Sequence, residues 1–170
     1  MGKFQGVFRD RPWLGELAIA RLDSILKPDS RVLECGAGAS TLWMAPKVKG
    51  IISYEHNPGW SQAVELELEK RKIKNVAVCF DPDYPKNGIK PSRKLFDIVI
   101  IDGRGRVKGV ETGFPLVKPG GFLILDNSNR ARYQPANDLM AVLKWDCAII
   151  QSPILPKNSK GYTTFWRRPK

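Results

Sequence analysis

One stretch of this sequence decides its fold: Val32-Leu33-Glu34-Cys35-Gly36-Ala37-Gly38-Ala39-Ser40-Thr41. The apolar residues before Glu34 predict a buried strand, and the apolar residues after Thr41 predict the start of a helix. Between them the chain must turn sharply. Gly36 and Gly38 permit a positive φ and lack the Cβ that would keep a ligand at a distance. A strand, a glycine loop and a helix in this order bind a nucleotide-like group at the carboxyl edge of a parallel sheet.

The residues around the two glycines favour a cationic cofactor over a dinucleotide. A dinucleotide site has the pattern G-x-G-x-x-G, and its third glycine position is Thr41 here. Glu34, two residues before Gly36, would repel a pyrophosphate and attract an ammonium group. S-adenosylmethionine carries a sulfonium and an α-amino group, so the pattern indicates this cofactor. Ser40 and Thr41 can cap the loop helix and offer hydroxyls to the carboxylate of the cofactor.

A second carboxylate supports an adenosine site. Glu55 ends the short apolar stretch Gly50-Ile51-Ile52-Ser53-Tyr54-Glu55. An acid about 20 residues after a glycine loop can accept hydrogen bonds from both ribose hydroxyls, and its charge strengthens these bonds. For His56, which follows directly, we expect contact with the adenosine or surface exposure.

From residue 31 to residue 166 the chain resembles the class I S-adenosylmethionine-dependent methyltransferases. The resemblance rests on the glycine loop, on Glu55 and on two further stretches: Phe96-Asp97-Ile98-Val99-Ile100-Ile101-Asp102-Gly103 and Lys118-Pro119-Gly120-Gly121-Phe122-Leu123-Ile124-Leu125-Asp126-Asn127. It implies a Rossmann-like three-layer α/β sandwich with a seven-stranded, mainly parallel sheet and one antiparallel strand in a C-terminal hairpin. It also implies that an acid after the third strand meets the adenine amino group, and Asp81 and Asp83 are both candidates.

The order of the predicted elements fits this fold. Apolar runs and helical periodicity predict strands over 31–34, 51–55, 76–80, 95–101 and 122–125, and helices over 10–26, 41–48, 58–71, 106–117 and 135–143. The segments 145–151 and 162–168 predict two strands of a hairpin. With 170 residues, the chain predicts a single domain over 1–170, with an N-terminal segment and helix over 1–28 and a core over 31–170.

Carboxylates stand at five consecutive predicted strand ends: Glu34, Glu55, Asp81, Asp102 and Asp126. In open α/β sheets, active residues lie beyond the carboxyl ends of the strands. We therefore expect these five acids to gather at one edge of the sheet. Glu34, Glu55, Asp81 and Asp102 are the candidates for binding the cofactor, together with the residues of the glycine loop and His56.

Asp102 and the pair Asp126-Asn127 form the candidate acceptor centre. The resemblance extends to the metal-dependent O-methyltransferases of the catechol and caffeoyl-coenzyme A type, which hold magnesium with an aspartate after the fourth strand and an Asp-Asn pair after the fifth. It thus implies Mg²⁺ at Asp102, Asp126 and Asn127, where oxygen ligands suit this ion and the ion would activate a hydroxyl. In the alternative interpretation, Asp102 binds the methionine end of the cofactor and Asp126-Asn127 caps a turn.

Arg104 departs from the metal-dependent pattern. Those enzymes commonly have a lysine base shortly after the first aspartate, and arginine does not deprotonate. Arg104 could instead clamp a carboxylate or phosphate of the acceptor. Asp102 and Arg104 are therefore the candidates for catalysis.

The composition bears on partners and location. The net charge is +11, from 28 Lys and Arg against 17 Asp and Glu. A basic surface attracts nucleic acid or another anionic partner, but no nucleic-acid motif is present, and a solvated basic surface is the other interpretation. No membrane span and no signal-peptide pattern are predicted. The three cysteines lack metal or disulfide spacing, so we expect free thiols and a cytoplasmic location.

These observations predict methyl transfer from S-adenosylmethionine to a hydroxyl of a small-molecule or sugar-like acceptor. Two alternatives remain open: a nucleic-acid methyltransferase that uses the basic surface, and a subunit that binds the cofactor without transferring its methyl group. The chain has few inserted segments from which to build an acceptor pocket. An oligomer or a partner subunit could therefore complete it.

Overall fold

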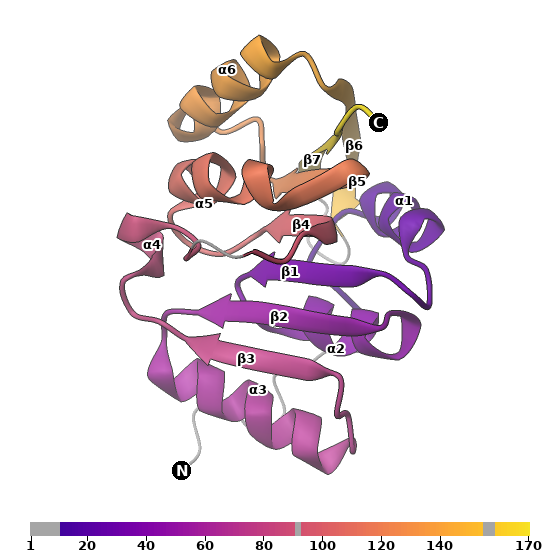
Figure 1. Ribbon diagram of the computed structural model, residues 1–170, viewed down its shortest axis with the longest axis vertical. Helices are drawn as coiled ribbons and strands as arrows, with labels where there is room; N and C mark the ends of the chain where they lie inside the picture. The colour runs from indigo at the N-terminus through magenta and orange to yellow at the C-terminus, as the bar shows by residue number, and fades with distance from the viewer. Residues whose placement is uncertain (1–10, 91–92, 155–158) are drawn as a thin grey trace.

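The computed structural model describes residues 11–90, 93–154 and 159–170, and these residues form one seven-stranded sheet (Figure 1). Its strand order is β3-β2-β1-β4-β5-β7-β6. The strands are β1 (Arg31–Cys35), β2 (Gly50–Glu55), β3 (Val76–Phe80), β4 (Phe96–Ile101), β5 (Val117–Asp126), β6 (Asp146–Ile154) and β7 (Ser159–Arg167). Only β7 runs antiparallel to its neighbours, β5 and β6. This confirms the predicted mainly parallel sheet with one antiparallel strand in a C-terminal hairpin.

Helices cover both faces of the sheet and complete three layers. The α-helices are α1 (Glu16–Ile25), α2 (Ala39–Met44), α3 (Pro58–Lys70), α4 (Tyr84–Asn87), α5 (Arg106–Gly113) and α6 (Gln134–Leu143). Short 3₁₀ turns follow or precede three of them: η1 (Ala45–Lys47), η2 (Phe114–Leu116) and η3 (Ala131–Tyr133). Helices α1, α2 and α3 supply buried side chains to one face, and α4, α5 and α6 supply them to the other.

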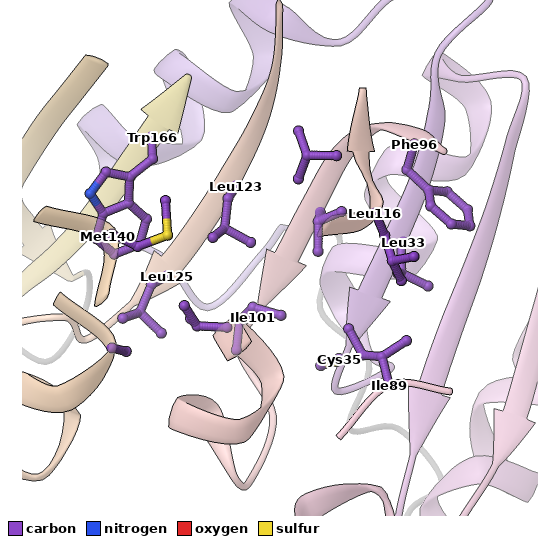
Figure 2. Close-up of a cluster of buried hydrophobic side chains, with 14 of the residues drawn as sticks. Leu33, Cys35, Ile89, Phe96, Ile101, Leu116, Leu123, Leu125, Met140 and Trp166 are labelled. Atoms are coloured by element: carbon purple, nitrogen blue, oxygen red, sulfur yellow. The ribbon is translucent and has the colours of Figure 1, made fainter. Parts of the chain in front are cut away.

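The central strands are buried on both faces because their side chains alternate between two apolar layers. In β4, Ile98 and Ile100 pack toward α1 and α2, whereas Val99 and Ile101 pack toward α5 and α6. Figure 2 shows the second layer, in which Leu123 and Leu125 of β5 lie between Ile101 and the Met140–Trp166 pair. Continuous apolar strands are typical of a parallel sheet covered on both sides.

The largest difference from the predicted elements is at the start of α1. The sequence predicts a helix from residue 10, but α1 begins at Glu16. Gly15 stands at its N-cap with an extended backbone (φ −67°, ψ 148°). A Cβ on Gly15 would lie 1.9 Å from Ser152 Oγ of β6, so a close contact with the sheet fixes where the helix starts. Residues 1–10 of the predicted N-terminal segment lie outside the described residues.

Other boundaries shift because short 3₁₀ turns and bends end the helices early. The helix predicted over 41–48 is α2, which begins at Ala39, ends at Met44 and continues as η1. The helix predicted over 106–117 ends at Gly113, and β5 begins at Val117. Helix α4 was not predicted at all. None of the helices in the described part of the chain is long and apolar enough to cross a membrane.

Candidate functional site

The topology brings the carboxyl ends of β1, β2 and β4 side by side. Cys35, the last residue of β1, pairs with Tyr54 of β2 and with Ile101 of β4. In the next pairing, Ile101 lies opposite Leu125 of β5. The five predicted carboxylates, Glu34, Glu55, Asp81, Asp102 and Asp126, therefore all lie at one edge of the sheet. The strand order reverses between β1 and β4, and this is where ligands of open α/β sheets bind.

The glycine loop approaches the loop after β4 very closely. Gly36 has φ +98°, and its N–H donates to Tyr54 O at 2.8 Å. A Cβ on Gly36 would lie 2.8 Å from Gly103 Cα, and a Cβ on Gly103 would lie 3.0 Å from Gly36 N. Gly36 thus adopts the positive φ that glycine permits, whereas Gly38 has an extended backbone with φ 167°. At Gly38 a Cβ would lie 3.6 Å from the Trp60 ring, an ordinary contact.

Glu34 is fully buried and is surrounded by hydroxyl groups of the chain itself. Ser40 and Thr41 each donate to it at 2.5 Å, and Ser53 donates at 2.7 Å. Thr41 Oγ1 also accepts the N–H of Gly38 at 2.8 Å. Burial raises the pKa of Glu34, and the three hydroxyls oppose this shift. Glu34 thus ties the loop to β2, and the hydroxyls that we expected to face a cofactor carboxylate donate to Glu34 instead.

Glu55 is held so that one carboxylate oxygen stays available. Its side chain is buried, and Oε1 accepts the backbone N–H groups of His56 and Asn57 at 2.9 and 2.8 Å. His56 Nδ1 lies 2.8 Å from the same oxygen, and its half-buried ring meets the Tyr84 ring edge-on. Among the described residues, no donor is hydrogen-bonded to Oε2. Oε2 is therefore the oxygen of this carboxylate that could accept a hydrogen bond from a ligand.

Asp81 follows β3 directly and has partners for both of its oxygens. Oδ1 accepts the N–H of Asp83 at 3.0 Å, and Oδ2 lies 2.9 Å from Lys90 Nζ. Lys90 keeps the pKa of Asp81 below its ordinary value. Asp83 is exposed. Of the two candidates for the adenine contact, Asp81 is the one that lies at the strand end in a fixed position.

Asp102 and Asp126 lie around one buried arginine. Arg106 Nη2 donates to Asp102 Oδ1 at 2.8 Å, and Arg106 Nη1 lies 3.3 Å from Asp126 Oδ2. Thr163 Oγ1 of β7 donates to Asp126 Oδ1 at 3.0 Å. Burial and the neighbouring Asp126 carboxylate raise the pKa of Asp102, and the Arg106 guanidinium opposes them. The two carboxylates therefore share one internal counter-charge.

The remaining basic side chains of this edge face solvent. Arg104 is exposed, and its backbone N–H donates to the hydroxyl of the buried Tyr84 at 3.2 Å. Arg130 and Arg132 are also exposed, in the segment after β5, and the Arg132 guanidinium lies 4.9 Å from the centre of the Tyr133 ring. Among the described residues, these three arginines have no acidic partner.

Solved structures share this architecture across nearly the whole chain. A precorrin 8w decarboxylase of Methanobacterium thermoautotrophicum matches 94% of this chain and 96% of its own at 17% identity, with a TM-score of 0.69. NodS, an N-methyltransferase of Bradyrhizobium japonicum solved with S-adenosyl-L-homocysteine, matches 99% of this chain and 94% of its own at 14% identity, with a TM-score of 0.67. An rRNA methylase of Streptococcus thermophilus matches 89% and 95% at 14% identity, with a TM-score of 0.64.

The chain has the class I methyltransferase fold. No family model matches the sequence, and no curated protein matches it either. The three solved proteins differ in the chemistry that their names describe. The methyltransferase fold therefore agrees with the predicted architecture and leaves the acceptor open.

The acceptor side of this methyltransferase fold does not fit the magnesium ion that the resemblance implies. The guanidinium of Arg106 already lies between Asp102 and Asp126. Asn127, the third predicted ligand, has φ +51°, and its backbone carbonyl accepts the N–H of Arg130 at 3.1 Å, as in a tight turn. No group of three or more His, Cys, Asp or Glu side chains in the described part of the chain could hold a metal ion. We derive no chemical step through a metal here.

Arg106 is the site residue that the sequence analysis missed. It is the first residue of α5, and a positive charge is unfavourable at the N-terminus of a helix. An arginine at this unfavourable position, four residues after Asp102, is the sequence signal that could have identified Arg106 as a partner of Asp102. The contact with Asp126 depends on the pairing of β4 with β5, which no local pattern contains.

Proposed function

We propose that this chain binds S-adenosylmethionine at the carboxyl edge of its sheet and transfers the methyl group to a hydroxyl of a small-molecule or sugar-like acceptor. The observation that carries the proposal is Glu55. A buried carboxylate that is fixed through one oxygen, with the other oxygen available, can accept hydrogen bonds from the ribose hydroxyls of the cofactor. It lies one strand away from the glycine loop, where an adenosine would extend toward β3.

Titration calorimetry with S-adenosylmethionine tests the cofactor site. We expect micromolar binding to the wild type and at least about tenfold weaker binding to Glu55→Ala, because a charge-assisted hydrogen bond is worth about 1.5–3 kcal/mol. Glu69→Ala is the matched control, since Glu69 is an exposed glutamate of α3. Equal affinity of all three proteins would reject the assignment of Glu55.

The acceptor proposal depends on Asp102 and Arg104. In methyl transfer, the acceptor oxygen attacks the sulfonium methyl carbon, the C–S bond breaks with its electron pair on sulfur, and the hydroxyl proton leaves. The raised pKa of Asp102 makes its carboxylate a stronger base than an exposed aspartate, so it suits this proton. Arg104, Arg130 and Arg132 suit an acceptor that carries a carboxylate or phosphate.

A panel of paired hydroxyl compounds tests this half of the proposal. Each pair has the same hydroxyl, with and without a carboxylate or phosphate, and formation of S-adenosylhomocysteine is measured. We expect turnover with the anionic members. We expect Arg104→Ala to raise their KM about tenfold, whereas Lys108→Ala, a change at an exposed lysine of α5, leaves it unchanged. Faster turnover of the neutral members would contradict the role of the arginines.

A nucleic-acid acceptor is the second candidate, because the net charge is +11 and the three exposed arginines lie at the same edge. Retention on RNA that falls steeply with salt, with a slope equivalent to several phosphate contacts, would favour it. Cofactor binding without turnover of the panel or of RNA would instead favour a subunit that acts with a partner.

A further inference from the structure

Arg106 lies in a cage made of oxygen atoms. Nε donates to Gly103 O at 3.0 Å, Nη2 donates to Asp102 O at 2.7 Å and Oδ1 at 2.8 Å, and Nη1 donates to the backbone oxygen and Oδ2 of Asp126. A guanidinium has five N–H donors, and these contacts use all of them. Two carboxylate oxygens and three carbonyl oxygens thus surround one cation.

This set of oxygens is the kind that binds a hard divalent metal ion in other proteins. Such ions take carboxylate and carbonyl oxygens as ligands. In this chain, the same oxygens accept hydrogen bonds from Arg106, which is only 8% exposed. The ring of Tyr133 covers the guanidinium, with its centre 5.4 Å from Arg106 Cζ. A metal ion would therefore have to displace a buried, fully hydrogen-bonded arginine.

The backbone around Arg106 is built to bring it there. Gly105 precedes it with φ +64°, and a Cβ on Gly105 would lie 2.0 Å from the backbone oxygen of Pro85 in α4. The left-handed residue sets the direction in which α5 begins. The backbone of the loop after β4 therefore fixes the position of the Arg106 guanidinium between Asp102 and Asp126.

We propose that Arg106 is a built-in cation that takes the place of a divalent metal at the Asp102–Asp126 pair, so that this site binds no metal and methyl transfer by the chain requires none. The statement about methyl transfer rests on the proposed function. The statement about metal binding does not, because it concerns only the oxygens around Arg106.

Titration with Mn²⁺, followed by the electron paramagnetic resonance signal of the free ion, tests the proposal. We expect the wild type to leave the signal unchanged, and Arg106→Ala to lower it by at least half at equimolar protein. In the double variant Arg106→Ala/Asp126→Ala the signal should return. Arg71→Ala is the matched control, because it removes an arginine from the ion pair with Glu67 on the surface of α3. A folded Arg106→Ala variant that gains no Mn²⁺ binding would overturn the proposal.

A second comparison decides the question if Arg106→Ala does not fold, as judged by circular dichroism. Wild type and Asp126→Asn are then titrated with Mn²⁺. Binding to the wild type that Asp126→Asn abolishes would show a metal at the carboxylate pair and overturn the proposal. Absence of such binding supports it.

The statement about methyl transfer has a separate test. Formation of S-adenosylhomocysteine should be unchanged by EDTA. If the chain does not bind S-adenosylmethionine at all, the proposed function is rejected, but the Mn²⁺ result still decides the statement about metal binding.

Discussion

At the carboxyl edge of the sheet, three buried carboxylates are stabilised by three different kinds of hydrogen-bond partner. Glu34 accepts from three hydroxyls, Glu55 from two backbone N–H groups, and Asp126 from a guanidinium and a threonine. Glu34 is the one of the three that serves as a shared acceptor for three buried hydroxyls, so we expect its loss to matter for folding.

Removal of the Glu34 side chain should destabilise the protein strongly. In Glu34→Ala, the buried hydroxyls of Ser40, Thr41 and Ser53 lose a shared acceptor, and each unsatisfied polar group costs about 1–3 kcal/mol. We expect the free energy of unfolding in urea to fall by about 3 kcal/mol or more. Glu65→Ala, an exposed change on α3, should leave it within about 0.5 kcal/mol. A similar effect of both changes would refute this account.

Replacement of Glu34 by glutamine should change the pH dependence of stability. Burial raises the pKa of Glu34 above 4.5, so the folded state holds the proton more tightly than the unfolded state. Stability therefore falls as pH rises from 4.5 through the raised folded pKa. Glu34→Gln cannot titrate at this position. Its free energy of unfolding should therefore rise relative to that of the wild type as pH rises. Urea unfolding of both proteins across this range measures it, and a constant difference would contradict it.

Gly103 should tolerate no side chain. A Cβ there would lie 2.0 Å from the Tyr84 hydroxyl and 3.0 Å from Gly36 N. We expect Gly103→Ala to lower the free energy of unfolding by about 1–3 kcal/mol, as overpacking does. Tyr84→Phe in the same chain should restore only part of it, since the backbone contact persists. Gly59→Ala, at an exposed position of α3, should be neutral or stabilising. Full tolerance of Gly103→Ala would mean that the two loops can separate.

At the scale of elements, the bounds of a helix or strand could be predicted where neighbouring residues in the sequence determine them. The strand over 76–80 was predicted with its observed bounds, because its apolar residues are continuous. The start of α1 was not predicted. Gly15, the residue before this helix, contacts Ser152, which is far away in the sequence. Pairs of elements that meet only in the folded chain, such as α1 with β6, leave no local pattern.

The contact between α1 and β6 can be tested directly. Gly15→Ala should lower the free energy of unfolding by about 1–3 kcal/mol, because its Cβ would lie 1.9 Å from Ser152 Oγ. The hydroxyl of Ser152 is buried and has no hydrogen-bond partner in the described part of the chain, so Ser152→Gly frees space without breaking a bond. The double variant should therefore be more stable than the two single changes predict. Additive effects would show that the contact is not the cause.

At the scale of the whole molecule, the sequence predicted the fold and the places of the strand-end carboxylates better than the contacts that these carboxylates make. Glu34 and Glu55 follow apolar strands and glycine patterns that can be seen locally. The Asp102–Arg106–Asp126 cluster depends on two strands and a helix start. The predicted magnesium ligands were at the predicted strand ends, but the cation between them is part of the chain.

Cofactor binding should stabilise the whole domain. A ligand at 100 times its Kd adds about 2.7 kcal/mol to the free energy of unfolding, and each kcal/mol raises Tm by about 2–4 °C in a chain of this size. We expect S-adenosylmethionine to raise Tm by several degrees in the wild type and by much less in Glu55→Ala, as measured by scanning calorimetry. NAD at the same concentration serves as the dinucleotide control. A larger shift with NAD would reject the methyltransferase interpretation.

The place of β7 in the sheet has a consequence for how the protein is made. β7 follows β6 in the sequence, yet it lies between β5 and β6 in the sheet. Until β7 has been synthesised, β6 lacks the one strand with which it pairs in the described sheet. The contact of Gly15 with Ser152 must also wait for β6. The contact at the N-terminal end of α1 therefore forms only after β7 has joined the sheet, although α1 already packs against β1 and β4.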